Sequence, residues 1–133
     1  AYVVYGAGLG ISTMASADAR IYPTSTGQEW GLEPAIFDDV TGDGQTDFGV
    51  GSHTANGNSG EAHVFSGRQS GVLGPADAVA HFSGEGASFA GLALEGMSDM
   101  DGDGHNEVLV GAYLLVHSET SSGAIYVLEA PGL

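Results

Sequence analysis

The sequence predicts an all-β protein built from repeated units of about four strands each. Short apolar runs rich in Val, Ile, Tyr and Phe alternate along the chain with Gly, Ser, Asn and Asp. The same elements return after about sixty residues, which is the mark of a repeat architecture. No long window has the i, i+3, i+4, i+7 apolar spacing of an amphipathic helix.

Two acidic loops, residues 39–47 and 99–107, provide the clearest repeat. Each has oxygen-bearing side chains at loop positions 1, 3, 5 and 9 and a glycine at position 6. A hard cation such as Ca²⁺ requires several oxygens on a tightly curled backbone, and glycine permits the sharp turn. We expect the position-7 residues to offer backbone carbonyls. The sequence therefore predicts two Ca²⁺ sites, with ligands Asp39, Thr41, Asp43, Gln45 and Asp47 in the first loop and Asp99, Asp101, Asp103, His105 and Glu107 in the second.

An EF-hand is the first alternative, because its loop also begins with alternating acids and a glycine. An EF-hand needs a bidentate Glu at position 12 and a helix on each side. Position 12 is Val50 in one loop and Val110 in the other, and strand-like residues follow both. The EF-hand is therefore excluded. An acidic turn that binds no ion remains an alternative, since Asp and Gly favour turns by themselves.

Other elements keep the same period and extend the repeat over almost the whole chain. Each is expected to be a short strand or to adjoin one, and together they give the strand order C–D, A–B–C–D, A–B–C, with the acidic loop between strands A and B. The matching segments are 48–51 and 108–111; 1–5, 60–65 and 123–128; 17–22 and 76–81; and 30–31 and 89–91.

Four strands in about sixty residues are typical of one blade of a β-propeller. We therefore predict a propeller segment of about two four-stranded antiparallel blades. Residues 1–27 form a partial blade with strands C and D, residues 28–84 a complete blade, and residues 85–133 a partial blade with strands A to C. Nine strands do not close a ring. Either a longer chain or a homo-oligomer is expected to complete it.

Composition excludes several functional classes. The chain has 17 acidic residues against two arginines and no lysine, a formal charge of −15. Nucleic-acid binding needs a basic surface, so it is excluded, and attraction to anionic membranes is disfavoured. No segment is long enough for a transmembrane helix, so membrane insertion is not expected. The absence of cysteine excludes disulfides and thiol chemistry, and the acidity fits an extracellular or cell-surface setting.

Catalytic motifs are absent from the sequence, so we expect no enzymatic activity. The five histidines lack zinc-ligand spacing, and neither H-E-x-x-H nor G-x-S-x-G occurs. His63 and His81 are expected to be strand positions within a blade. The best-grouped carboxylates are those of the acidic loops, and a bound cation would make them poor general bases.

The acidic loop between two strands, followed by a G-x-x-Y-V-hydrophobic strand, resembles the FG-GAP repeat of the integrin α-subunit β-propeller and its bacterial relatives. The resemblance implies Ca²⁺ at both loops, bound by the ten residues named above, and a role in extracellular binding or adhesion to a protein or glycan. Two alternatives stay open: a non-catalytic fragment of a propeller lyase or hydrolase, and a purely structural self-assembling module.

Overall fold

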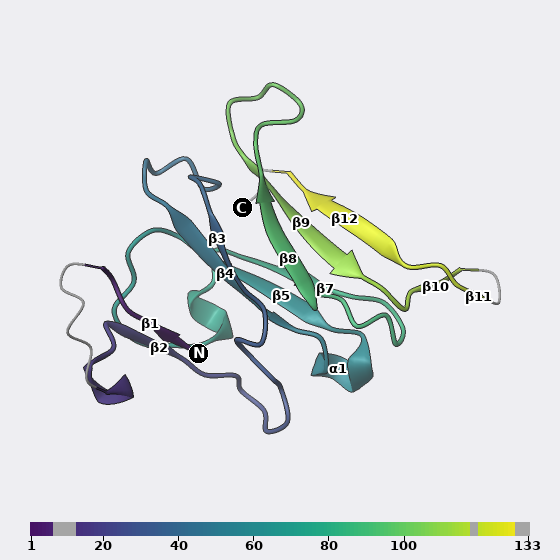
Figure 1. The fold of residues 1–133 in the computed structure, drawn as a ribbon, viewed down its shortest axis with the longest axis horizontal. Coiled ribbons are helices and arrows are strands. Elements are labelled where there is room, and N and C mark those ends of the chain that lie inside the picture. The colour runs from purple at the N-terminus through teal and green to yellow at the C-terminus, as the bar shows by residue number, and fades with distance from the viewer. Residues whose placement is uncertain (7–12, 118–119, 130–133) are drawn as a thin grey trace.

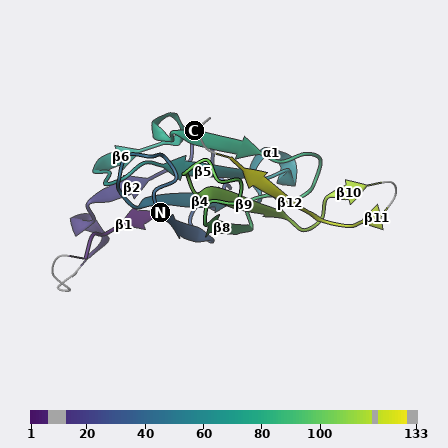
Figure 2. The ribbon, with the colours of Figure 1, turned by 90° about the horizontal axis from the view of Figure 1, so that it is seen from above.

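The computed structural model describes residues 1–6, 13–117 and 120–129, and it confirms the predicted all-β fold. Three small sheets lie next to one another with apolar side chains between them, as in an incomplete propeller (Figure 1). A fourth, two-stranded sheet projects from one end of the molecule (Figure 2). No helix in the described ranges is long and apolar enough to cross a membrane.

The central sheet has four antiparallel strands in the order β3–β4–β5–β7, and residues 66–79, which connect the last two, include a strand of a neighbouring sheet. Side chains alternate between its two faces. On one strand, Ala62 and Val64 point to one neighbouring sheet, whereas Phe65 points to the other. All three are buried because a sheet covers each face. The strands are β3 (Pro34–Phe37), β4 (Asp47–Ser52), β5 (Glu61–Phe65) and β7 (Ala80–Ser83).

A three-stranded antiparallel sheet covers one face of the central sheet, with the order β8–β9–β12. The core between the two sheets includes Phe37 and Val64 from the central sheet and Leu94, Val108 and Val110 from the outer one. These residues are 8 % exposed or less, so their burial is the main stabilising contribution at this interface. The strands are β8 (Ala93–Met97), β9 (Glu107–Ala112) and β12 (Ala124–Leu128).

The opposite face of the central sheet packs on the sheet formed by β1, β2 and β6. Its core includes Ile21 and Leu73 from that sheet, Val50 and Phe65 from the central sheet, and Trp30 between them. β2 pairs with β1 in antiparallel fashion and with β6 in parallel. The strands are β1 (Tyr2–Val3), β2 (Ala19–Ile21) and β6 (Gly71–Leu73).

The structure corrects some of the predicted strand limits. A strand was expected at 76–81, but Pro75–Asp77 is a 3-10 turn and the strand begins at Ala80. The turn forms because the Asp77 carboxylate accepts a hydrogen bond from the Gly74 N–H at 2.7 Å, and proline favours the first helical position. Residues 30–31 are a turn, and in 89–91 only Ala90 pairs, in an isolated parallel bridge with Gly60.

Several short elements were not predicted from the sequence. They are the parallel strand β6, the hairpin β10 (Val116–His117) and β11 (Thr120–Ser121), the 3-10 turn η1 (Met14–Ser16), and α1 (Ala55–Asn58). α1 contains three residues with positive φ, Asn56, Gly57 and Asn58, so it is a tight turn rather than a regular helix. The division of the chain into blades at residues 27 and 84 stays a prediction.

A glycine on β4 allows the central sheet to approach the backbone segment that precedes β8. A Cβ added to Gly51 on β4 would lie 1.8 Å from the carbonyl oxygen of Gly91, which precedes β8. Real Cβ atoms do not come so close, so no other residue fits position 51 unless the sheets move apart. The contact thus sets the spacing between the central sheet and β8.

Replacing Gly51 with alanine is therefore expected to destabilise the fold. The added methyl group would force the two sheets apart, at a cost of roughly 1–3 kcal/mol or more in the free energy of unfolding. Urea denaturation followed by circular dichroism would measure this cost. Gly6→Ala is the control, because nothing lies within 4 Å of that position and its φ is not positive. An equal stability for Gly51→Ala and Gly6→Ala would contradict the packing described.

Candidate metal centre

The two acidic loops lie at the same end of the molecule, each closing an antiparallel pair of strands (Figure 1). The first loop joins β3 to β4 and the second joins β8 to β9. They touch one another, because a Cβ added to Gly42 would lie 2.8 Å from Cε1 of His105. The adjacent packing of the two sheets thus brings together loops that are sixty residues apart in sequence.

The second loop gathers four carboxylates around one point. One oxygen from each of Asp99, Asp101, Asp103 and Glu107 lies within 4.8 Å of the others. The three aspartates are exposed, whereas Glu107 is 1 % exposed at the start of β9. Four like charges at this spacing repel one another, and a divalent cation relieves the repulsion.

Backbone N–H groups hold these carboxylates in place. The Asp99 carboxylate accepts hydrogen bonds from Gly102 N–H at 2.6 Å and from Gly104 N–H at 2.9 Å. The Asp103 carboxylate accepts one from His105 N–H at 2.8 Å. Gly102 and Gly104 both have positive φ, which curls the backbone around the aspartates. The loop is therefore ordered as an oxygen cage by its own backbone.

Glu107 carries the strongest sign that this cage fits a cation. Its Oε2 accepts a hydrogen bond from Met100 N–H at 2.7 Å. Its Oε1 is buried and has no hydrogen-bond partner among the described residues. A buried, unpartnered carboxylate oxygen is unfavourable, and a bound cation would satisfy it. The donor set is composed of oxygens alone, which suits Ca²⁺.

The first loop has the same backbone pattern but uses its position-9 acid differently. The buried Asp47 accepts hydrogen bonds from Val40 N–H and Thr41 N–H at 3.0 Å, and from Gly67 N–H at 2.6 Å. Both of its oxygens are therefore satisfied by the protein. Asp47 joins the loop to the turn that follows β5.

A second hydrogen bond joins the first loop to the turn that follows β5. The Ser66 hydroxyl donates to Asp43 Oδ2 at 2.7 Å, while Gln45 N–H donates to Asp43 Oδ1 at 2.8 Å. Asp39 accepts from Asp43 N–H and from Gly44 N–H, as Asp99 does from its own loop. Thr41 Oγ1 is buried without a partner among the described residues. Within the described ranges, the carboxylates of this loop do not converge as those of the second loop do.

Ser66 and Gly67 were missed by reasoning from the sequence. They lie about twenty residues after the loop that they contact, and a Ser-Gly pair after a strand reads as an ordinary turn. The ten predicted ligands thus fall into two groups. The structure brings the four acidic members of the second loop together, and metal binding at both loops remains a prediction.

The fold and the loops together define a β-propeller segment with acidic inter-strand loops. Residues 96–128, from within β8 to the end of β12, match the family model for the FG-GAP repeat. This region includes the whole second acidic loop, so the match supports the resemblance to the FG-GAP repeat that the sequence indicates. The search of curated proteins found no match to this chain.

The contrast between Asp47 and Glu107 gives a prediction for calcium-free buffer. An asparagine at 47 has one oxygen and cannot accept from both Gly67 and the Val40–Thr41 pair, so Asp47→Asn should lose roughly 1.5–3 kcal/mol of stability. Glu107→Gln keeps an oxygen for Met100 N–H and removes one repelling charge. It should lose less than about 1 kcal/mol.

Urea denaturation of both variants in a chelating buffer would test this contrast. A loss for Glu107→Gln as large as that for Asp47→Asn would show that both acids are structural in the same way. It would remove the distinction drawn between a satisfied and an unsatisfied carboxylate.

Proposed function

We propose that the chain is a calcium-binding FG-GAP propeller module in which the ion has a structural role. The observation that carries the proposal is the convergence of Asp99, Asp101, Asp103 and Glu107, with Glu107 Oε1 buried and unpartnered. These four residues and the His105 carbonyl would hold the ion. When bound, Ca²⁺ supplies positive charge to the cluster and nothing else. The protein residues fix the loop between β8 and β9.

Calcium is preferred over magnesium on the chemistry of the donors. Ca²⁺ accepts six to eight oxygens in a flexible arrangement, whereas Mg²⁺ demands a small octahedron and keeps much of its water. A loop offering four carboxylates suits the larger ion. The first loop would bind more weakly, because the protein already satisfies Asp47 and Asp43. An extracellular or cell-surface setting, where Ca²⁺ is abundant, fits this proposal and the charge of −15.

The biological role that we propose is non-enzymatic binding or adhesion toward a protein or glycan. The support is the FG-GAP match together with a scaffold in which sheets hold loops at both ends. Loops on a rigid scaffold are where such proteins bind partners. The connection that contains α1 lies at the end opposite the acidic loops, so a ligand there would not displace the ion (Figure 1).

Calcium should raise the melting temperature of the chain. At about one hundred times its dissociation constant, one bound ion adds roughly 2.7 kcal/mol, which corresponds to several degrees for a domain of this size. Differential scanning calorimetry across a Ca²⁺ titration would measure the rise. Asp103→Ala should abolish most of it, whereas Glu85→Ala, which removes an exposed acid outside the loops, should leave it unchanged.

Magnesium at the same concentrations is the ion control. An equal rise with Mg²⁺, or an undiminished rise in Asp103→Ala, would contradict a specific Ca²⁺ site at the second loop. No rise at all would overturn the proposed metal binding.

One observation favours the self-assembling alternative as a second candidate. Ile125 and Val127 on β12 occupy the repeat positions of Ala62 and Val64, which the neighbouring sheet buries. On β12 these side chains are 72 % and 44 % exposed. The outer face of the β8–β9–β12 sheet thus corresponds to the face of the central sheet that a neighbouring sheet covers. On β8–β9–β12 this face is exposed. We propose that a second copy of the chain covers it.

Light scattering on the purified chain in calcium and physiological salt would test this assembly. Salt is needed because the charge of −15 opposes association. A discrete oligomer that Ile125→Asp dissociates would support the second candidate. A monomer at all concentrations, or an oligomer unaffected by Ile125→Asp, would contradict it.

A further inference from the structure

A second cluster of metal-binding residue types lies on the central sheet, away from the acidic loops. Glu61 and His63 are two positions apart on β5, so they point to the same face. His81 on β7 is the direct cross-strand partner of His63. The three side chains open into a cleft of about 410 Å³ next to α1, whose other polar lining residues are Thr24, Ser25, Gln28, Asn56 and Ser83.

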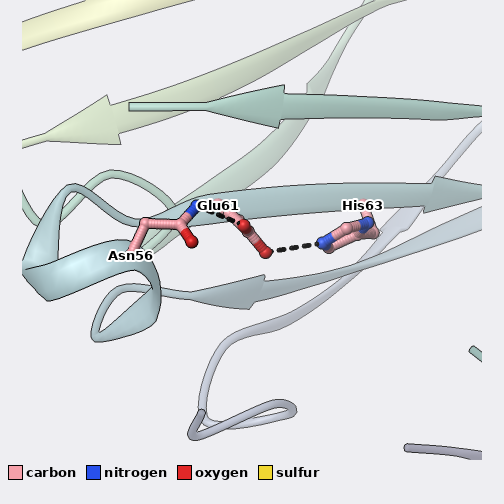
Figure 3. Close-up of polar contacts among 3 residues, drawn as sticks. All are labelled: Asn56, Glu61 and His63. Atoms are coloured by element: carbon pink, nitrogen blue, oxygen red, sulfur yellow. Dashed lines mark hydrogen bonds and ion pairs between the residues drawn. The ribbon is translucent and has the colours of Figure 1, made fainter. Parts of the chain in front are cut away.

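Glu61 and His63 are already placed as a pair of donors. Glu61 Oε2 lies 3.1 Å from His63 Nε2, and Asn56 Nδ2 donates a hydrogen bond to the other carboxylate oxygen, Oε1 (Figure 3). His63 is 3 % exposed and packs against the Trp30 ring, with the ring centroids 4.5 Å apart. Packing against Trp30 fixes the His63 imidazole, and the Asn56 amide fixes the Glu61 carboxylate.

We propose that Glu61, His63 and His81 form a site for a divalent transition-metal ion such as Zn²⁺. Zinc takes two imidazole nitrogens and one carboxylate oxygen in many proteins, with the remaining position open to water. Two donors bound to one Zn²⁺ at about 2.0–2.1 Å lie near the spacing that Glu61 and His63 already have. Asn56 supplies the outer hydrogen bond that ligating carboxylates commonly receive.

Only His81 must move for the site to close. Its ring is stacked on that of His63 with centroids 6.0 Å apart, and the residue is exposed. An exposed side chain changes rotamer at little cost, and directly opposed residues on antiparallel strands have Cβ atoms about 4.5–5.5 Å apart.

The alternative is that Glu61 and His63 form a purely structural hydrogen bond. His63 Nδ1 and Gln28 Oε1 are buried without partners among the described residues, so the surroundings of this pair are poorly satisfied as they stand. Hydrogen bonding alone therefore explains the positions of Glu61 and Asn56. It does not explain why the His81 imidazole and the Gln28 amide line the same cleft. A water on a bound ion would give Gln28 Oε1, whose residue lines the cleft, a hydrogen-bond donor.

Zinc titration by calorimetry on the full chain, in millimolar Ca²⁺ to fill the acidic loops, tests the proposal. We expect one saturable Zn²⁺ site, weakened about tenfold or more by His81→Ala and by Glu61→Gln. Titration with Co²⁺ should give the visible absorption of a site with nitrogen ligands, and His81→Ala should lose it. His81 is exposed, so its variant should fold even if a substitution at His63 does not.

His53→Ala is the matched control. His53 Nε2 lies 3.7 Å from Glu29 Oε2, so the pair has the same residue types as Glu61 and His63 but a different position. Zinc binding should be unchanged in this variant. The proposal is overturned if the unmodified chain binds no Zn²⁺, if His81→Ala binds it as tightly, or if His53→Ala causes the same loss. The Co²⁺ spectrum reports nitrogen ligands, so its loss in His81→Ala does not depend on whether Ca²⁺ binds the oxygen donors of the acidic loops.

Discussion

The structure depends on one buried carboxylate at the end of each acidic loop, where the following strand begins. Asp47 and Glu107 are 0 % and 1 % exposed, and each accepts backbone N–H groups from the beginning of its own loop. A buried carboxylate must be paired or hydrogen-bonded, so each loop curls back over its acid. In the first loop the protein completes this requirement through Gly67, and in the second one oxygen is left over. The first loop thus satisfies its buried acid by itself, whereas the second leaves one carboxylate oxygen without a partner among the described residues.

Packing of the sheets places the two acidic hairpins side by side at one end of the molecule. The central sheet buries both faces, and the close approach of Gly51 to Gly91 fixes its distance from the next sheet. Because His105 rests on Gly42, an ion bound in the second loop would also restrain the first. The opposite end holds α1 and the cleft with Glu61, His63 and His81. Metal chemistry at the two ends would therefore differ, with oxygen donors at one and mixed donors at the other.

Much of the fold could be predicted from the sequence because the repeat imposes period and strand order at once. The acidic loops were found by their spacing, and the structure places both between the expected strands. What could not be predicted depends on contacts distant in sequence. Ser66 and Gly67 contact Asp43 and Asp47 only because β5 pairs back on β4, and β6 pairs with β2 across fifty residues of chain. His63 and His81 lack a linear zinc pattern, and only the register of β5 and β7 makes them neighbours.

The most direct test of this account is a crystal structure of the chain grown with calcium, with anomalous scattering used to locate the ion. The account predicts a calcium peak among Asp99, Asp101, Asp103 and Glu107, in contact with Glu107 Oε1. Its occupancy in the first loop should be lower, because Asp47 is already satisfied by three backbone N–H groups. A second loop without an ion at saturating calcium, or a peak in the first loop alone, would contradict it.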